Sequence, residues 1–178
     1  MRPLTSAALG GRFGTEFERF RACCPDTRVL IETGRLLLCE SGTYVTTVVD
    51  RKTSRGTTYL ILKNTLNGFL RPALARLIAS PAEPLYTCRD EVRIRPLRTD
   101  GPMETVTLAG NLCTAADIIA ENIRLPRLMP GDAVALSHAG SYAAALSPMQ
   151  FSSQEPPAEL FLTAAGEILP DKRNRRYL

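Results

Sequence analysis

Three groups of side chains along this chain could bind an anion or move a proton. Glu32 and Arg35 lie three residues apart after an apolar run, and Arg71 precedes a proline after a second apolar stretch. Cys113 stands in a later stretch of small and polar residues. A guanidinium group has the planar donor geometry that suits phosphate or carboxylate, and a thiol whose pKa lies near the working pH can transfer a proton. The residue types alone name no reaction.

The length and composition limit the kinds of protein that this can be. A chain of 178 residues suits one domain, or one domain with part of another. It is too short for a closed (β/α)₈ barrel, which needs roughly 200–250 residues. The apolar fraction of 44% and the charged fraction of 22% are those of a folded globular protein. A net charge of +4 with 6% aromatic residues argues against a nucleic-acid-binding surface.

The cysteine and histidine content argues against a zinc site and favours a reducing compartment. The five cysteines form no C-x-x-C pair, and His138 is the one histidine. An odd number of cysteines and a start without a signal-peptide pattern are typical of a cytoplasmic protein. No window approaches the ~18 uninterrupted apolar residues of a membrane span. We therefore expect a cytoplasmic protein with no metal, membrane or nucleic-acid partner.

A short N-terminal segment must position the Glu32–Arg35 pair. Three phenylalanines recur at helical spacing between residues 13 and 20, which predicts an amphipathic helix that ends at Pro25. The apolar run at 28–32 predicts a strand that is buried on both faces. A helix followed by such a strand is the end of an α/β unit, and one such unit cannot form a sheet alone.

From residue 40 onwards the chain has the pattern of a β domain. β-branched or alternating segments predict strands at 44–49, 57–62, 91–95, 104–108, 132–137 and 158–162, with a hairpin loop at 51–56 and helices at 72–78 and 115–122. Six or seven short strands joined by polar turns make a closed barrel or a sandwich. The predicted fold is therefore mainly β, with residues 1–39 as a helix–strand unit and residues 40–178 as a β-barrel domain.

Several ordered motifs resemble those of one known family. They are Glu-Thr-Gly-Arg at 32–35, Leu-Asn-Gly-Phe-Leu-Arg-Pro-Ala-Leu at 66–74, Gly-Asn-Leu-Cys-Thr-Ala-Ala-Asp at 110–117 and Ala-Gly-Ser-Tyr at 139–142. Over residues 26–162 this order is similar to the C-terminal part of the fold-type III pyridoxal-phosphate-dependent decarboxylases, which act on diaminopimelate, ornithine and arginine. The resemblance implies a C-terminal Greek-key β-barrel or sandwich preceded by the remnant of a (β/α)₈ TIM barrel. The Asn-Gly-Phe-Leu-Arg-Pro form favours the siderophore-biosynthesis subgroup.

The resemblance implies pyridoxal 5'-phosphate as cofactor and assigns three residues to it. Glu32 matches a glutamate that pairs with the pyridine nitrogen, where a carboxylate keeps the ring protonated and makes it a better electron sink. Arg35 matches an arginine that holds phosphate or substrate carboxylate, and Tyr142 matches a tyrosine that contacts the cofactor. Thr33 replaces the family's usual proline. The alternatives are a surface charge pair for Glu32 and Arg35 and a core side chain for Tyr142.

Three further residues match positions that contact the substrate in this family. Arg71 matches an arginine that binds the substrate carboxylate, and Cys113 matches a cysteine that reaches across the dimer interface and returns a proton after decarboxylation. Thr114 replaces an acid that binds the distal end of the substrate, which argues against diaminopimelate or ornithine. Ala75 replaces a substrate-contacting tyrosine. The alternatives are a solvated turn residue for Arg71 and a buried small side chain for Cys113.

Two further polar residues, in or next to these motifs, are given structural roles. Asp117 is expected to cap the helix predicted at 115–122 or to hold its loop. His138 lies on an alternating segment and is expected to be a structural histidine.

The Schiff-base lysine of the family has no counterpart among Lys52, Lys63 and Lys172, the three lysines of this chain. In the family that lysine lies on the (β/α)₈ barrel, upstream of the matched region. We therefore expect a fragment, a split-gene product or a degenerate remnant that is inactive alone and works as a homodimer or with a barrel-domain partner chain. The expected substrate is a small carboxylate-bearing amino acid. The alternative is a non-catalytic β-barrel interaction module that retains only the fold.

Overall fold

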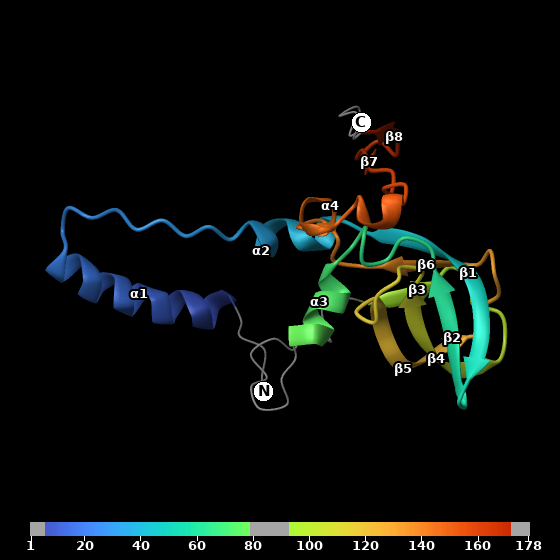
Figure 1. Ribbon diagram of the computed structural model, residues 1–178. Helices are drawn as coiled ribbons and strands as arrows, with labels where there is room; N and C mark the ends of the chain where they lie inside the picture. Colours follow the sequence, from blue (N-terminus) through green and yellow to red (C-terminus); the bar gives the residue numbers. More distant parts are fainter. Residues whose placement is uncertain (1–5, 79–92, 172–178) are drawn as a thin grey trace. The chain divides into compact units, whose positions relative to one another are not determined.

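The computed structural model describes residues 6–78 and 93–171, which divide into two units between Thr33 and Gly34. Among its described residues the first unit has one helix, α1 (Ser6–Cys23) (Figure 1). On it the rings of Phe13 and Phe17 stack with their centroids 5.6 Å apart. The predicted N-terminal helix is confirmed, and it begins earlier than the phenylalanine spacing indicates.

Residues 27–33 follow α1 without regular secondary structure. Val29, Leu30 and Ile31 are exposed, so the buried strand predicted at 28–32 is wrong for this structure. A strand is stable when neighbouring strands pair with its backbone N–H and C=O groups and other elements cover its side chains. The described part of the first unit contains no strand with which residues 28–32 could pair, and the apolar run stays exposed. The origin of residues 1–39 in an α/β unit stays a prediction.

The second unit is built on a six-stranded, nearly closed, barrel-like sheet (Figure 1). The strands are β1 (Tyr44–Ser54), β2 (Thr57–Leu62), β3 (Ile94–Pro96), β4 (Met103–Gly110), β5 (Ile118–Pro126) and β6 (Ala133–Leu136). They are hydrogen-bonded in the order β3-β6-β1-β2-β4-β5, and all neighbours are antiparallel except the parallel pair β2–β4. The predicted mainly β fold is confirmed.

Short helices and a small sheet complete the second unit. They are α2 (Gly34–Leu38), the 3₁₀ helix η1 (Cys39–Ser41), α3 (Arg71–Ile78), α4 (Ala143–Leu146), the 3₁₀ turn η4 (Phe151–Ser153), and the antiparallel pair β7 (Leu160–Leu162) and β8 (Ile168–Pro170). The helix predicted at 72–78 is confirmed by α3, and the last predicted strand is confirmed in the shorter form of β7. The sequence analysis did not anticipate α2, α4 or β8.

The β1–β2 hairpin is tighter than predicted. β1 continues to Ser54, and the turn consists of Arg55 and Gly56, whose φ angles are 51° and 80°. Positive φ at both central positions is characteristic of the two-residue turns that match the twist of paired strands. Most of the loop predicted at 51–56 is therefore strand.

The helix predicted at 115–122 is wrong. Residues 111–117 form a loop, and β5 begins at Ile118 and pairs with β4, with Ala120 opposite Leu108. The branched side chains of Ile118 and Ile119 favour extended backbone. β4 also supplies partners for the backbone groups of β5, so tertiary pairing outweighs the local helical pattern.

Two apolar clusters stabilise the second unit. The main core consists of Tyr44, Val48, Leu60, Leu62, Phe69, Val106, Leu108, Ile119, Leu125, Leu128, Val134 and Leu136. The smaller cluster joins Leu66, Ala73 and Leu112. These three residues come from the segment after β2, from α3 and from the loop after β4. The smaller cluster therefore packs the elements of Arg71 and Cys113 against each other.

Candidate functional site

Arg35 and the Ala-Gly-Ser-Tyr motif at 139–142 lie together in the second unit. Arg35, in α2, is partly buried, and its Nη1 donates a hydrogen bond to Ser141 Oγ at 3.4 Å. Two backbone hydrogen bonds of 2.9 and 3.0 Å, from residues 139 and 140 to residues 42 and 39, join the same segments. Two motifs that are 106 positions apart in the sequence thus form one corner of the unit.

Two glycines allow the two segments to approach this closely. A Cβ atom on Gly140 would collide with the Leu38 carbonyl oxygen and Ser41 Oγ, and one on Gly42 would collide with the Gly140 backbone. A side chain at either position would push the segments apart. The glycine of the Ala-Gly-Ser-Tyr motif is therefore needed for the contact between Ser141 and Arg35.

Tyr142 follows this contact directly and has an unusual backbone conformation. Its φ of 61° and ψ of 13° lie in the left-handed region, which residues other than glycine rarely adopt. The residue is 53% exposed, so the alternative of a core tyrosine is wrong. Strained backbone of this kind is held by its surroundings and is common at functional sites.

Glu32 and this corner belong to different units of the chain. Glu32 belongs to the first unit, in the irregular segment after α1, and it is exposed. Arg35 belongs to the second unit. The predicted pair thus spans the boundary between the units, and the role of Glu32 stays a prediction.

Arg71 begins α3 at the end of a folded segment, residues 64–70. Phe69 N donates to Thr65 O at 2.7 Å, and the buried Phe69 ring packs on Tyr44. Leu70 N donates to Ser147 Oγ at 2.8 Å. These bonds fix the backbone that leads into Arg71. Arg71 is itself partly buried, unlike a fully solvated turn residue.

Cys113 lies in the loop that joins β4 to β5. It is exposed, and its Sγ forms a hydrogen bond of 3.7 Å with Ser152 Oγ in which either atom can donate. The alternative of a buried small side chain is therefore wrong. The next residue, Thr114, accepts a hydrogen bond from Ala116 N at 3.2 Å through its Oγ1, which stabilises the loop. The side chain of Ala75, the other predicted departure, lies outside the described side chains.

The buried carboxylate of Asp117 joins the Cys113 loop to residues 64–70. Its Oδ2 accepts a hydrogen bond from Leu112 N at 3.1 Å. Its Oδ1 accepts one from Leu66 N at 3.1 Å and another from Thr65 Oγ1. The sequence analysis expected Asp117 to cap the helix predicted at 115–122 or to hold its loop. That helix does not form, and the bond to Leu112 N holds the loop. The bonds to a segment 51 residues earlier had no signal in the sequence.

Three serines to which the sequence analysis gave no role connect these loops. They are Ser141, which bonds to Arg35; Ser147, which bonds to Leu70; and Ser152, which bonds to Cys113. Serine is common in turns of every kind. Its residue type therefore gave no means of distinguishing these three from other serines.

His138 makes local contacts. Its Nδ1 lies 2.7 Å from Ser137 Oγ, and its Nε2 lies 3.7 Å from Oε1 of the exposed Glu40. Its φ of 63° is again left-handed. These contacts tie the end of β6 to η1, in keeping with the structural role expected for this histidine.

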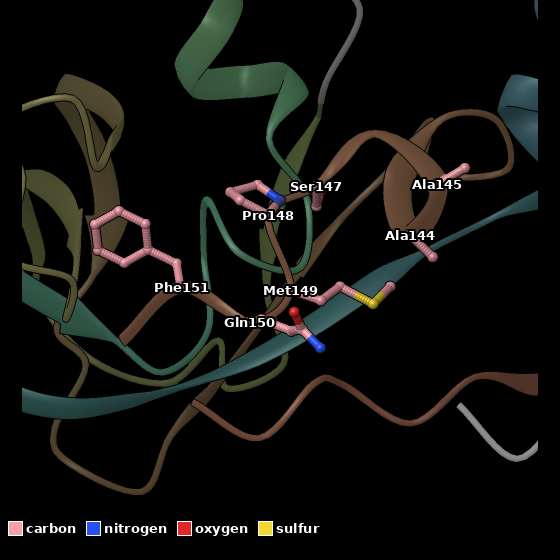
Figure 2. A pocket seen from close by; sticks show the side chains of 7 residues that line it. All are labelled: Ala144, Ala145, Ser147, Pro148, Met149, Gln150 and Phe151. Atoms are coloured by element: carbon pink, nitrogen blue, oxygen red, sulfur yellow. The ribbon is translucent and has the colours of Figure 1, made fainter. Parts of the chain in front are cut away.

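A pocket of about 450 Å³ lies just after Tyr142 in the chain (Figure 2). It is lined by Ala144, Ala145, Ser147, Pro148, Met149, Gln150 and Phe151. Its lining is mostly apolar and uncharged, so the pocket alone is a poor site for phosphate or carboxylate. The charged residues predicted for those groups lie on the loops described above.

Neither a metal cluster nor a bilayer-crossing helix is found in the described part of the chain. Across residues 6–78 and 93–171, no three His, Cys, Asp or Glu side chains are placed to share a metal ion. Over the same ranges, no helix has both the length and the apolar character that a bilayer crossing requires.

Hydrogen bonds thus connect the elements that carry four of the predicted site residues. Residues 64–70, which lead into Arg71, are bonded to the Cys113 loop through Asp117. They are also bonded to Ser147, which follows α4 and Tyr142. The segment of Tyr142 is in turn bonded to Arg35. One set of linked segments therefore carries two guanidinium groups, a thiol and a phenol, which belong to Arg35, Arg71, Cys113 and Tyr142.

Comparison with known proteins gives matches over most of the chain. The family model described as pyridoxal-dependent decarboxylase, C-terminal sheet domain, matches residues 25–140. L-glutamyl-(BtrI acyl-carrier protein) decarboxylase from Niallia circulans is 32% identical over 139 residues, with 76% of this chain and 31% of that protein covered. The 2-((L-alanin-3-ylcarbamoyl)methyl)-2-hydroxybutanedioate decarboxylase from Staphylococcus aureus is 27% identical, with 93% of this chain and 45% of that protein covered.

A solved structure shares the fold of the second unit. The crystal structure of diaminopimelate decarboxylase from Helicobacter pylori complexed with L-lysine matches with a TM-score of 0.61 and 28% identity, over 78% of this chain and 30% of that one. The chain thus spans less than half the length of the relatives that it matches. Since the family model covers well over half of the sequence, this chain belongs to the pyridoxal-dependent decarboxylase family and corresponds to its C-terminal sheet domain.

Proposed function

We propose that this chain forms the C-terminal domain of a pyridoxal-phosphate-dependent decarboxylase that acts on a carboxylate-bearing amino acid. The observation that carries the proposal is the hydrogen-bonded linkage of the loops that bear Arg35, Arg71, Cys113 and Tyr142. All four residues match substrate or cofactor positions of the family, each on a separate motif, and hydrogen bonds link the segments that carry them. A module that retained only the fold could keep most of these hydrogen bonds and lose the four side chains, so the presence of all four favours a catalytic domain.

The residues of the Arg35 corner fit the phosphate of the cofactor. The guanidinium group of Arg35 is partly buried and bonded to the hydroxyl of Ser141, and the exposed Tyr142 is the next residue in the chain. A guanidinium group binds phosphate through charge-assisted and often bidentate hydrogen bonds, and a hydroxyl group can add a further donor. We assign Arg35 and Tyr142 to the phosphate and Glu32 to the pyridine nitrogen. When bound, pyridoxal phosphate supplies the electron sink that loss of carbon dioxide requires.

Cys113 is assigned to proton return. An exposed thiol that is hydrogen-bonded to Ser152 can reach a substrate carbon in a site completed by another chain. We propose that this other chain contains the (β/α)₈ barrel with the Schiff-base lysine, either in a homodimer of a longer protein or as a separate partner. Both arrangements leave the same groups of this domain in the shared site.

The substrate is proposed to lack a distal ammonium group. Arg71 would bind its carboxylate, and Thr114 stands where family members that act on diamino substrates have an acid. The names of two relatives describe action on an L-glutamyl acyl-carrier protein and on a substituted hydroxybutanedioate, and neither name includes a distal amine. This agrees with the resemblance to the siderophore-biosynthesis subgroup. A carboxylate-rich amino acid is therefore the favoured class over diaminopimelate or ornithine.

Reconstitution tests the proposal. The chain is mixed with pyridoxal phosphate and the barrel domain of the Staphylococcus aureus relative, and carbon dioxide release is measured from diaminopimelate, ornithine and the substrate named for that relative. We expect release from the carboxylate-rich substrate, and a loss of about 10²–10⁴-fold in kcat for Cys113→Ser. Cys23→Ser, in the first unit, is the matched control and should leave kcat unchanged.

Two results would contradict the proposal. One is the absence of carbon dioxide release with barrel domains from several relatives, although those barrels are active with their own C-terminal domains. The other is release that is equally fast with Cys113→Ser and with the unaltered chain. The first result would indicate the non-catalytic interaction module, and the second would remove Cys113 from the reaction.

A further inference from the structure

Asp117 is a buried carboxylate whose hydrogen bonds all come from two loops of the candidate site. The residue is 2% exposed. Its two oxygens accept bonds from the backbone of Leu66 and Leu112 and from the hydroxyl of Thr65. Among the salt bridges of the described residues none involves Asp117. Its charge is therefore stabilised by N–H and O–H donors, as charge-assisted hydrogen bonds allow.

The chain around Asp117 is shaped to accept it. Asp117 O accepts a hydrogen bond from Gly110 N at 2.8 Å, which closes the loop that contains Cys113. A Cβ atom on Gly110 would collide with both the Asp117 carboxylate and Thr65 Oγ1. Leu66 and Leu112, the two backbone donors, also pack together in the smaller apolar cluster. Burial of a carboxylate is costly unless such donors satisfy it. A change in the conformation of the Cys113 loop would remove these donors, so the buried carboxylate favours the observed conformation.

The two halves of the carboxylate hold different loops. Oδ1 binds Thr65 and Leu66, on the segment that leads to Arg71, and Oδ2 binds Leu112, the residue before Cys113. We infer that Asp117 is a positioning residue that fixes the Cys113 thiol relative to the Arg71 segment. The inference rests on the proposed role of Cys113, and it adds the residue through which the thiol is placed.

One isosteric substitution distinguishes the hydrogen bonds that Asp117 Oδ1 accepts from the one that Oδ2 accepts. In Asp117→Asn we expect the remaining oxygen to face Thr65 and Leu66, because two donors point to that side. The amide N–H then faces Leu112 N, where two donors repel. Thr65→Val is the matched control, since it removes one donor from the Arg71 side and leaves the Leu112 bond intact. Leu108→Ala, in the main core, is the control for general loss of stability.

The measurements use the 178-residue chain, and they report on the loop without requiring catalysis. Backbone amide exchange is followed at Leu112 and Leu66, and alkylation by iodoacetamide is followed at Cys113, with the exposed Cys23 as the internal reference. In Asp117→Asn we expect the Leu112 amide to exchange about tenfold faster and the Cys113 to Cys23 alkylation ratio to rise by a similar factor. Leu66 should stay protected. Thr65→Val and Leu108→Ala should leave the alkylation ratio within about twofold of that of the parent.

The inference is overturned if Asp117→Asn leaves the Leu112 amide and the alkylation ratio unchanged, or if Leu108→Ala changes that ratio as much. Should Asp117→Asn fail to fold, exchange in the unaltered chain still decides the matter. Leu112 and Leu66 must both be protected there, and free-peptide exchange at Leu112 would contradict the inference.

In the reconstituted enzyme, Asp117→Asn should lower kcat with little change in KM, as expected for misplacement of a proton donor. Failure of reconstitution would count against the proposed function alone, because the exchange and alkylation results do not depend on it.

Discussion

Leu30 in the first unit and Leu108 in β4 have the same side chain in similarly apolar sequence, but their surroundings differ. Leu108 is fully buried among the strands of the sheet, whereas Leu30 is 75% exposed in an irregular segment. The difference is that β4 has hydrogen-bonded neighbours on both sides, and residues 27–33 have no strand beside them in the described part of their unit. An apolar run therefore predicts burial only where the chain also supplies the elements that cover it.

The β7–β8 pair shows that backbone pairing alone is insufficient. Phe161 lies opposite Leu169, and the side chains of both strands are exposed. A two-stranded ribbon satisfies only part of its backbone and covers neither face, which is why isolated hairpins are marginally stable in water. The sheet of six strands differs because its side chains also pack on one another.

The largest expected effect on stability comes from the substitution of leucine by alanine, made once in β4 and once in residues 27–33. Leu108→Ala removes a fully buried side chain and should lower the free energy of unfolding by about 2–5 kcal/mol. Leu30→Ala, its matched control, should change it by less than about 0.5 kcal/mol. Urea unfolding followed by circular dichroism measures both. Equal effects would show that residues 27–33 are covered in solution and would remove the contrast.

A smaller effect on the free energy of unfolding is expected when a tightly packed glycine and an exposed glycine are each replaced by alanine. Gly110→Ala inserts a methyl group against Asp117 and Thr65 and should lower the free energy of unfolding by about 1–3 kcal/mol, because overpacked buried sites must shift. At Gly34 a Cβ atom meets no atom within 4 Å, so Gly34→Ala is the control and should be nearly neutral. Thermal unfolding of the two variants checks this. A neutral Gly110→Ala would indicate that the Asp117 junction is loose.

The smallest expected effect on the free energy of unfolding concerns Tyr44, whose buried hydroxyl donates a hydrogen bond to Asn64 O. Tyr44→Phe should lower the free energy of unfolding by about 0.5–1.5 kcal/mol at neutral pH through loss of this hydrogen bond. Burial, and to a lesser extent the negative charge of Asp117, raise the pKa of Tyr44 well above its ordinary 10.0. The difference between the parent and Tyr44→Phe should therefore depend on pH.

The direction of that dependence follows from proton binding. Above pH 10 the unfolded tyrosine has lost its proton while folded Tyr44 keeps it, so the folded state binds more protons and stability falls as the pH rises. Phenylalanine has no such proton. Urea unfolding between pH 8 and about 11 should thus show the gap between the parent and Tyr44→Phe narrowing. Tyr59→Phe, on β2 and only partly buried, is the control. A gap that stays constant with pH would contradict the prediction.

Much of the fold could be predicted because its signals are local. The β-branched and aromatic runs at 44–49 and 57–62 match β1 and β2, and the helical turns predicted at 72–78 match α3. The prediction failed at 115–122, where the residues suit a helix but the neighbouring strand β4 pairs with them. It also failed at 28–32, where no neighbouring strand is present among the described residues of the unit.

For the candidate site, the order of motifs identified the family and named Arg35, Arg71, Cys113 and Tyr142. It did not show that Asp117 and three serines connect their loops, since the bonds between different loops join residues 39 to 106 positions apart. Short polar side chains are common in turns throughout proteins, so only their final partners distinguish them.

By itself, the sequence determined a mainly β domain and the set of charged, thiol and phenol groups that this family uses, because residue types and spacing act over a few positions. Tertiary structure alone decided which apolar runs are covered, where β5 begins, and how the loops of the candidate site meet. Those outcomes depend on hydrogen bonds and packing between segments far apart in the chain, whose free energy exists only once the segments have been brought together.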